Sequence, residues 1–207
     1  MDYNFDRMKC FRCFLWIFCI LAAAPAFAAG DLTIFGAAQH QGKLTLQSAE
    51  TTASNFSTNF NPGTFGTFGL RFSHGKVIGG EHTIAYAPNF LSADSKAIIY
   101  NSNILLQAPL PKVTPYVTAG LGTVFSWGTE NGLPALGNLG TKFAINYGGG
   151  VKVFPAGPIG VRFDIRGYVI PSATFNVPLP TNPLLTVKSQ SQNLNLLEAG
   201  LGVVFKF

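Results

Sequence analysis

Charged residues are scarce in this chain. Asp, Glu, Lys and Arg make up 11% of its 207 residues, whereas hydrophobic residues make up 47%. An ordinary soluble domain carries about 25% charged residues, and the mean hydropathy of +0.28 is high for such a domain. The net charge of +5 is dispersed along the chain. It therefore does not predict a nucleic-acid partner.

Long hydrophobic runs are also missing beyond the N-terminal segment. A transmembrane helix needs about 20 consecutive, mainly apolar residues, and no such run follows residue 28. The high hydropathy therefore cannot come from membrane-spanning helices. A membrane-spanning β-sheet spreads its hydrophobic residues over alternate positions, and it reconciles the two observations.

The N-terminal segment has the three parts of a secretory signal peptide. Basic residues precede the apolar run 14–24, which is followed by an Ala-Phe-Ala site at 26–28. This order is typical of a signal peptide that is cleaved during export. We therefore expect residues 1–28 to be removed and residues 29–207 to form a single exported domain.

Cysteine is absent from the expected mature domain. The three cysteines of the chain are Cys10, Cys13 and Cys19, and all lie in the expected signal peptide. The mature domain is therefore expected to fold without disulfides or zinc thiolates and to contain no thiol nucleophile.

The C-terminal segment 197–207 alternates strictly between two kinds of residue. One set of positions is apolar and consists of Leu197, Ala199, Leu201, Val203, Phe205 and Phe207. The positions between them hold two glycines, Glu198, Val204 and Lys206. Alternate residues of a strand point to opposite faces, so one face of this strand is apolar and the other is small or charged.

This last strand resembles the closing strand of bacterial outer-membrane β-barrels. The segment 143–168, with Asn-Tyr-Gly-Gly-Gly-Val-Lys at 146–152 and Gly-Val-Arg-Phe-Asp-Ile-Arg at 160–166, is similar to the penultimate hairpin of small outer-membrane β-barrel domains. That family includes OmpA-like and OmpX-like barrels. The resemblance implies an all-β, eight-stranded antiparallel up-and-down transmembrane β-barrel, surrounded by outer-membrane lipid and lipopolysaccharide. It also implies that Phe205 and Phe207 form a C-terminal signal for the barrel assembly machinery.

Eight segments of the mature chain can supply membrane-spanning strands. A tilted strand needs about 9 to 11 residues to cross the hydrocarbon layer. We expect strands at 32–47, 64–73, 77–87, 96–108, 113–127, 141–154, 159–170 and 193–207. Short connections alternate with long ones, and all are rich in turn-forming residues. Short periplasmic turns and longer extracellular loops are the pattern of outer-membrane barrels, and they place both chain ends on the periplasmic side.

Most of the expected strands have one face of large apolar residues and one of small or polar residues. Strand 159–170 places its Ile, Val and Phe residues mainly on one face and its Arg and Asp residues on the other. In 113–127 and 141–154 the second face is rich in glycine, which suits a strongly curved wall around a narrow lumen. Strands 32–47 and 77–87 alternate less cleanly, so their facing stays open.

The charged residues on the glycine-rich faces have both signs. Burying a charge costs several kcal/mol unless it is paired, so we predict that these residues pair and plug the lumen. The predicted lumen cluster consists of Lys152, Arg162, Asp164, Arg166, Glu198 and Lys206.

The histidines raise the alternative of a lipid-modifying enzyme. Such a hydrolase or acyltransferase needs a nucleophile, a base and an orienting acid close together. His40 and His82 fall in the strands of open facing, with Ser48 and Glu81 as candidate companions, whereas His74 lies in a turn. Because no Gly-x-Ser-x-Gly motif and no pair with metal-ligand spacing is present, we predict no catalytic residue, metal or cofactor. The enzyme is favoured only where one of the two strand histidines points into lipid beside a serine and an acid.

We therefore predict an integral protein of the outer membrane of a Gram-negative-type bacterium. The expected role is structural or adhesin-like, exercised at the cell surface by the long loops at 48–63 and 171–192, because loops on a rigid scaffold commonly carry binding. A further alternative is a soluble β-barrel that carries an apolar ligand. That carrier requires the opposite facing, with the large apolar side chains inside.

Overall fold

The structure is a computed structural model, and it describes most of the chain beyond the N-terminal segment. The described residues are 30–42, 44–47, 57–60, 63–130, 133–134, 138–173, 176–179, 182–188 and 192–207. Within these ranges no helix is long and apolar enough to cross a membrane.

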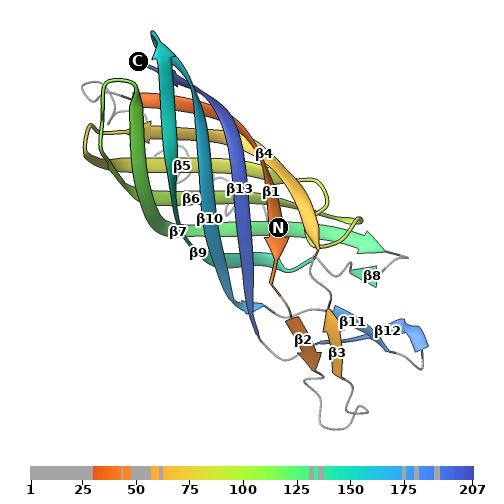
Figure 1. Cartoon of the computed structure of the whole chain (residues 1–207). Coiled ribbons are helices and arrows are strands. Elements are labelled where there is room, and N and C mark those ends of the chain that lie inside the picture. The colour runs from red at the N-terminus through yellow and green to blue at the C-terminus, as the bar shows by residue number, and fades with distance from the viewer. Residues whose placement is uncertain are drawn as a thin grey trace, which may run out of the picture.

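Eight long antiparallel strands form a closed barrel (Figure 1). Each barrel strand pairs with the barrel strands before and after it in the chain, and β1 pairs with β13 to close the ring. The barrel strands are β1 (Gly30–Gln41), β4 (Thr64–His74), β5 (Ile78–Ala87), β6 (Ser95–Gln107), β7 (Val113–Glu130), β9 (Gly140–Ala156), β10 (Ile159–Ala173) and β13 (Gln192–Lys206). The expected all-β, up-and-down architecture is confirmed.

The two ends of the barrel differ in their connections. Short turns join β4 to β5, β6 to β7 and β9 to β10, and we call this end the turn end. It also holds Gly30 and Phe207, whose backbones are hydrogen-bonded to each other. The longer connections lie at the opposite end, the loop end, where the short strand β8 (Leu133–Pro134) pairs with the end of β7.

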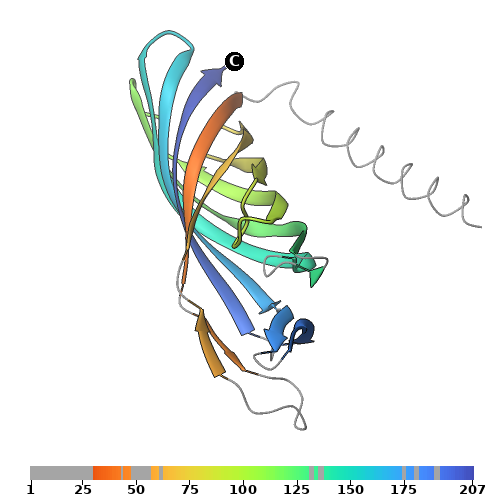
Figure 2. The same ribbon diagram turned by 90° about the vertical axis from the view of Figure 1, so that its right-hand side faces the viewer.

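Two of the longer connections contain hairpins of their own. These are β2 (Leu44–Gln47) with β3 (Ser57–Phe60), and β11 (Asn176–Leu179) with β12 (Asn182–Lys188). Figures 1 and 2 show both hairpins beyond the loop end of the barrel. The first corrects the expected strand at 32–47: β1 ends at Gln41, close to the last residues that β4 and β13 pair with it, and the segment 44–47 pairs with β3 instead.

The pairing register climbs around the barrel. The row of paired residues that starts at Gly30 passes through His74, Gly80, Ile104, Ala119, Tyr147, Gly167 and Leu197 and returns to β1 at His40. The row has then shifted by the ten residues that separate Gly30 from His40. With a rise of about 3.3 Å per residue and about 4.8 Å between strands, this shift tilts the strands by about 40° to the barrel axis. An eight-stranded barrel of this kind has an interior that side chains can fill.

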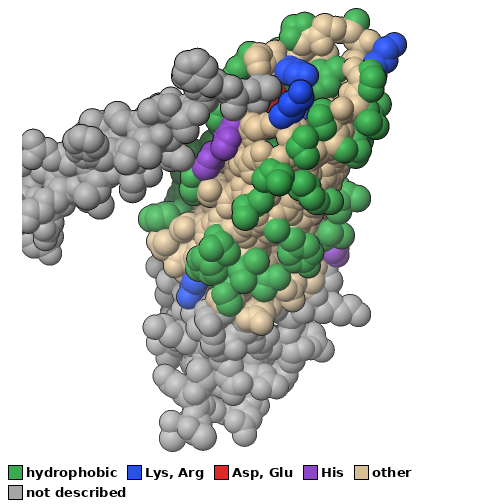
Figure 3. Space-filling model, turned by 90° about the vertical axis from the view of Figure 1, so that its left-hand side faces the viewer, with side chains coloured by type: hydrophobic (Ala, Val, Ile, Leu, Met, Phe, Trp, Pro, Cys, Tyr) green, Lys and Arg blue, Asp and Glu red, His purple; other side chains and the backbone are tan. Residues whose placement is uncertain are grey.

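Large apolar side chains cover the outer wall, and the charged ones lie inside. Ile104 and Ile165 on the outside are 71% and 60% exposed, whereas Glu81 and Arg166 on the inside are 0% exposed. Figure 3 shows hydrophobic side chains over the wall of the barrel and Lys and Arg side chains near its ends. The sequence left undecided which faces of β1 and β5 point into the barrel. Both strands place polar residues inside, since β1 buries Thr33 and β5 buries Glu81. This facing is the reverse of what a soluble carrier requires.

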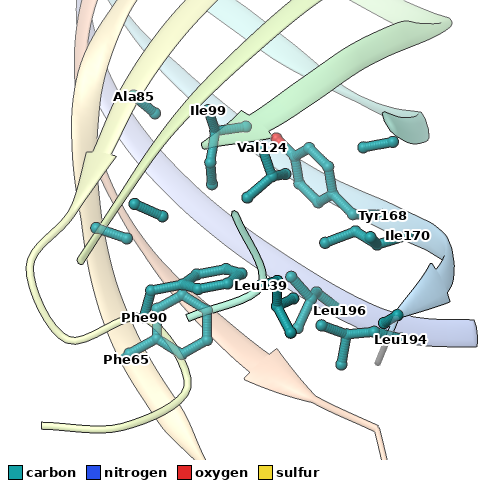
Figure 4. Packing of buried hydrophobic residues seen from close by; sticks show 14 of the residues in the cluster. Phe65, Ala85, Phe90, Ile99, Val124, Leu139, Tyr168, Ile170, Leu194 and Leu196 are labelled. Atoms are coloured by element: carbon teal, nitrogen blue, oxygen red, sulfur yellow. The ribbon is translucent and has the colours of Figure 1, made fainter. Parts of the chain in front are cut away.

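The inner wall is itself divided along the barrel. Toward the loop end it is apolar, and Figure 4 shows Phe65 and Phe90 packed together there, with ring centroids 5.3 Å apart in an edge-to-face arrangement. The surrounding buried residues include Ala87, Ala97, Ile99, Val124, Leu139, Ile170, Leu194 and Leu196. Phe90 comes from the connection between β5 and β6 and is fully buried, so this connection folds into the mouth of the barrel. Toward the turn end, the inner wall carries the charged residues.

Candidate functional site: the charged lumen

Arg71 on β4 reaches over β1 to two other strands. Its Nη2 atom lies 2.5 Å from Glu198 Oε1 on β13, and its Nη1 atom donates a hydrogen bond to Asp164 Oδ2 on β10. The guanidinium carbon lies 3.7 Å from the centroid of the Phe35 ring, which gives the cation an aromatic face as well. The ion pairs of this one arginine thus connect β4, β10 and β13, and its ring contact adds β1.

Arg162 and Arg166 on β10 reach across the lumen to Glu81 on β5. Arg162 Nη2 donates to Glu81 Oε2, and Arg166 Nη2 lies 2.7 Å from Glu81 Oε1. Both arginines also pair with Asp164 on their own strand, at 3.1 Å and 3.5 Å. Because β5 and β10 are four strands apart in a ring of eight, they are opposite each other. These ion pairs therefore bridge the full width of the barrel.

Tyr116 adds hydrogen bonds to this network, and Gly150 leaves room for it. The Tyr116 hydroxyl on β7 donates to Asp164 Oδ2 at 2.9 Å and accepts from Arg162 Nε at 2.8 Å. A Cβ at Gly150 on β9 would lie 2.7 Å from the Tyr116 hydroxyl and 2.7 Å from Asp164 Cβ. The same Cβ would lie closer still to the Phe163 carbonyl oxygen on β10, so both the neighbouring backbone and the charged network require glycine at this position.

Two further contacts extend the network along the barrel. Lys152 Nζ on β9 lies 2.5 Å from Asp31 Oδ2 on β1, close to the turn end. Toward the apolar half, Gln39 Nε2 donates to Glu198 Oε2 at 2.6 Å. Polar contacts thus continue from the turn end up to the apolar layer.

Among the residues whose burial the structure describes, the buried charges balance. The cations are Arg71, Lys152, Arg162 and Arg166, and the anions are Asp31, Glu81, Asp164 and Glu198. An isolated buried ion costs several kcal/mol, and good pairing with extra hydrogen bonds offsets that cost. Balance and cross-barrel pairing therefore make a filled, closed lumen physically acceptable.

The structure brings together five of the six residues predicted for the lumen cluster. Arg162, Asp164, Arg166 and Glu198 belong to the arginine–carboxylate network, and Lys152 pairs with Asp31 nearer the turn end. Sequence reasoning missed the members of this network on other strands, namely Asp31, Arg71, Glu81 and Tyr116. Arg71 carries a detectable signal, because it alternates with the large apolar residues of β4.

Lys206 lies outside the network. It is the last residue of β13, its side chain is exposed, and its Nζ atom lies 5.8 Å from the centroid of the Phe154 ring. The alternation places it on the inner face, but at the rim of the barrel that face opens to solvent. Phe205 and Phe207, the residues of the expected assembly signal, are exposed on the outside, and the Phe207 ring stacks on Phe72 at 6.3 Å.

The strand histidines point outward. His82 Nδ1 lies 3.2 Å from the Tyr100 hydroxyl, its ring stacks on His74 at 6.0 Å, and its register partner on β6 is the exposed Ser102. His40 Nδ1 lies 2.9 Å from Thr64 Oγ1.

No carboxylate side chain that the structure describes faces outward beside these histidines. Of the carboxylates whose side chains the structure describes, Asp31, Glu81, Asp164 and Glu198 are buried inside the barrel and Asp94 is in a connection at the loop end. Ser48, the other candidate companion, lies outside the described residues. In the described part of the chain, no three His, Cys, Asp or Glu residues are placed to hold a metal ion.

Comparisons with solved structures give the same fold. Neisserial surface protein A is 12% identical over 86% of this chain and 97% of that chain, with a TM-score of 0.56. The outer membrane protein OprG from Pseudomonas aeruginosa is 12% identical over 87% of this chain and 97% of that chain, with a TM-score of 0.57. At these identities the similarity shows the fold alone. A search of curated proteins finds no match.

The sequence itself matches a family over most of its length. The match covers residues 14–207, and the family is described as the outer membrane protein beta-barrel domain. The closed ring of eight strands, apolar outside and charged inside, agrees with that description. The chain belongs to the outer membrane protein β-barrel domain family.

Proposed function

We propose that this protein is a non-conducting scaffold of the outer membrane that presents its loop-end hairpins at the cell surface. The observation that carries the proposal is the pairing of Arg162 and Arg166 with Glu81, which joins opposite walls of the lumen. A second barrier supports it, because Phe65 and Phe90 pack inside the barrel nearer the loop end. Ions that cross the barrel would have to break both layers.

The surface role is supported by the two hairpins beyond the loop end. β2 with β3 and β11 with β12 form small sheets separate from the barrel sheet. With the short turns in the periplasm, these hairpins lie outside the cell, where they meet lipopolysaccharide and an extracellular partner. Loops held by a rigid scaffold are the usual place for binding.

The proposal includes no catalysis. His82 faces outward beside Tyr100 and near Ser102, but no described carboxylate accompanies it, so the orienting acid of a hydrolytic triad is not provided. The remaining partners are outer-membrane lipid around the apolar wall and, during biogenesis after signal-peptide removal, the assembly machinery that reads Phe205 and Phe207.

The test is single-channel recording of the purified protein in planar lipid bilayers. We expect no discrete conductance steps, because paired charges inside a narrow, low-dielectric lumen hold each other in place. A general porin, inserted under the same conditions, provides the positive control. Regular conductance steps whose frequency rises with the amount of inserted protein would contradict the proposal.

A further inference from the structure

A pocket opens at the turn end, below the charged network. Its volume is about 260 Å³, and it is lined by residues of β1, β6, β7, β9 and β13, of the turn between β4 and β5 and of the turn between β6 and β7. Its charged lining consists of three lysines, Lys76, Lys152 and Lys206, and one carboxylate, Asp31. Figure 3 shows Lys and Arg side chains gathered at this end of the barrel.

The floor of the pocket is the ammonium group of Lys152, which is held in place by two neighbouring side chains. Lys152 is 1% exposed and lies 2.5 Å from Asp31 Oδ2, and it also donates to Gln107 Oε1 at 3.3 Å. The Gln107 amide in turn donates to the Gly75 carbonyl at 2.6 Å, which fixes Gln107 to the turn after β4. Because Lys152 and Asp31 neutralise each other, the floor adds little net charge.

The rim of the pocket carries the unbalanced charge. Lys76 and Lys206 are exposed, and within the described part of the chain neither has a carboxylate within 4.0 Å. The single acid of the lining, Asp31, is engaged by Lys152. The pocket therefore has an excess of positive charge from two lysines that face a preformed hollow.

We propose that this pocket binds a phosphate group. Lys76 and Lys206 hold its oxygen atoms from the rim, as ammonium groups bind phosphate through charge-assisted hydrogen bonds. The Lys152–Asp31 pair below them forms a polar, nearly neutral floor, so the positive charge of the site comes from the rim. The phosphate is that of a soluble phosphate ester or of a phospholipid headgroup, since both are found beside a rim that faces the periplasm.

The test uses the processed protein in nanodiscs of zwitterionic phosphatidylcholine, with inorganic phosphate as the probe. Titration is followed by the backbone amide signals of Gly30 and Gly75 at constant ionic strength, because exposed charges are screened by salt. We expect saturable shifts in the wild type and an affinity lowered by about tenfold or more in the double variant Lys76→Gln, Lys206→Gln.

Two single variants serve as controls, and both are expected to keep the barrel folded, as checked by heat-modifiable migration on gels. Lys112→Gln removes a lysine from the turn end that does not line the pocket, and Lys96→Gln removes one from the opposite end. Both are expected to bind phosphate within about twofold of the wild type. Shifts that do not saturate, or an equal loss of affinity in Lys112→Gln, would overturn the proposal.

A second set of nanodiscs identifies the source of the phosphate. Where the natural ligand is a headgroup, phosphatidylglycerol in the nanodisc competes with inorganic phosphate and weakens its apparent affinity in the wild type but not in the double variant. Where the ligand is soluble, the affinity is the same in both lipids. Either result supports a phosphate site and assigns its ligand.

Discussion

Asp164 lies at the centre of the charged lumen. It contacts all three buried arginines, Arg71, Arg162 and Arg166, and accepts a hydrogen bond from Tyr116. Because those arginines come from β4 and β10, a single carboxylate joins the two sides of the network. The net charge of the lumen depends on this residue remaining ionised.

The variant Asp164→Asn tests that dependence. It leaves the lumen with one uncompensated positive charge, although each of the three arginines keeps its pair with Glu81 or Glu198. Removing one partner of a buried ion pair costs about 3 to 5 kcal/mol. We expect a lower free energy of unfolding by about that amount, measured by urea unfolding from lipid vesicles. The matched control is Asp94→Asn in an exposed connection, with an expected change within about 0.5 kcal/mol. Equal stability of the two variants would contradict the role given to the network.

At the residue scale, the sequence reveals which side chains face inward better than it reveals which ones meet. The charges of β10 were predictable because they alternate with large apolar residues along one strand. Their partner Glu81 was not assigned to the lumen, since it stands among Gly79, Gly80 and His82, where the alternation fails. The contact between Arg162 and Glu81 joins residues 81 positions apart, and it depends on barrel closure, which no local pattern encodes.

At the element scale, the connection between β5 and β6 closes the loop-end mouth. Ser95 Oγ and the backbone of Phe90 are hydrogen-bonded to each other, and Leu91 has a φ of 64°. That φ is uncommon for a residue with a side chain. The preceding residue, Phe90, lies inside the barrel, where its ring packs against Phe65.

The variant Phe90→Ala tests this closure. It removes a fully buried ring, which costs about 3 to 5 kcal/mol where the surrounding side chains cannot collapse. We expect that loss in urea unfolding from lipid vesicles. Phe125→Ala on the outer wall removes the same ring from a site that is 56% exposed, and lipid chains can fill the space, so the loss should be smaller. If Phe125→Ala were the more damaging change, the inward-folded connection would not be a stabilising part of the barrel.

The existence of the barrel strands was predictable from the sequence, but their ends were less so. The segment 32–47 continues its β-forming pattern beyond Gln41, yet β1 ends there because the pairing with β4 and β13 ends. The length of a barrel strand is set by its neighbours as well as by its own residues. For the same reason the hairpin strands β2 and β3 were expected partly as barrel strand and partly as loop.

At the scale of the whole molecule, the barrel and the hairpins should be separable. Replacing residues 43–62 and 174–191 by short Gly-Ser linkers removes both hairpins. The replacement does not touch the residues that pair within the barrel. We expect unchanged heat-modifiable migration on gels, because loops tolerate such replacements. Attachment of expressing cells to surfaces coated with fibronectin, laminin or collagen should fall to the level of cells with an empty vector.

The wild-type protein sets the reference for that assay. It should raise attachment to at least one of the three coatings above the empty-vector level. The adhesin-like role would be refuted if the wild type gave no such increase, or if the trimmed protein attached equally well while remaining at the surface, as shown by protease accessibility of intact cells.

The seam between β1 and β13 has a consequence for the order of events in biogenesis. These two strands are the first and the last of the ring, so β4 satisfies one edge of β1, whereas the amide and carbonyl groups along its other edge stay unpaired until β13 is present. In the hydrocarbon layer, an unpaired strand edge costs several kcal/mol for each backbone group that lacks a hydrogen bond. Insertion must therefore wait until the last strand has been delivered across the inner membrane, and the chain has to be kept from aggregating throughout that delay.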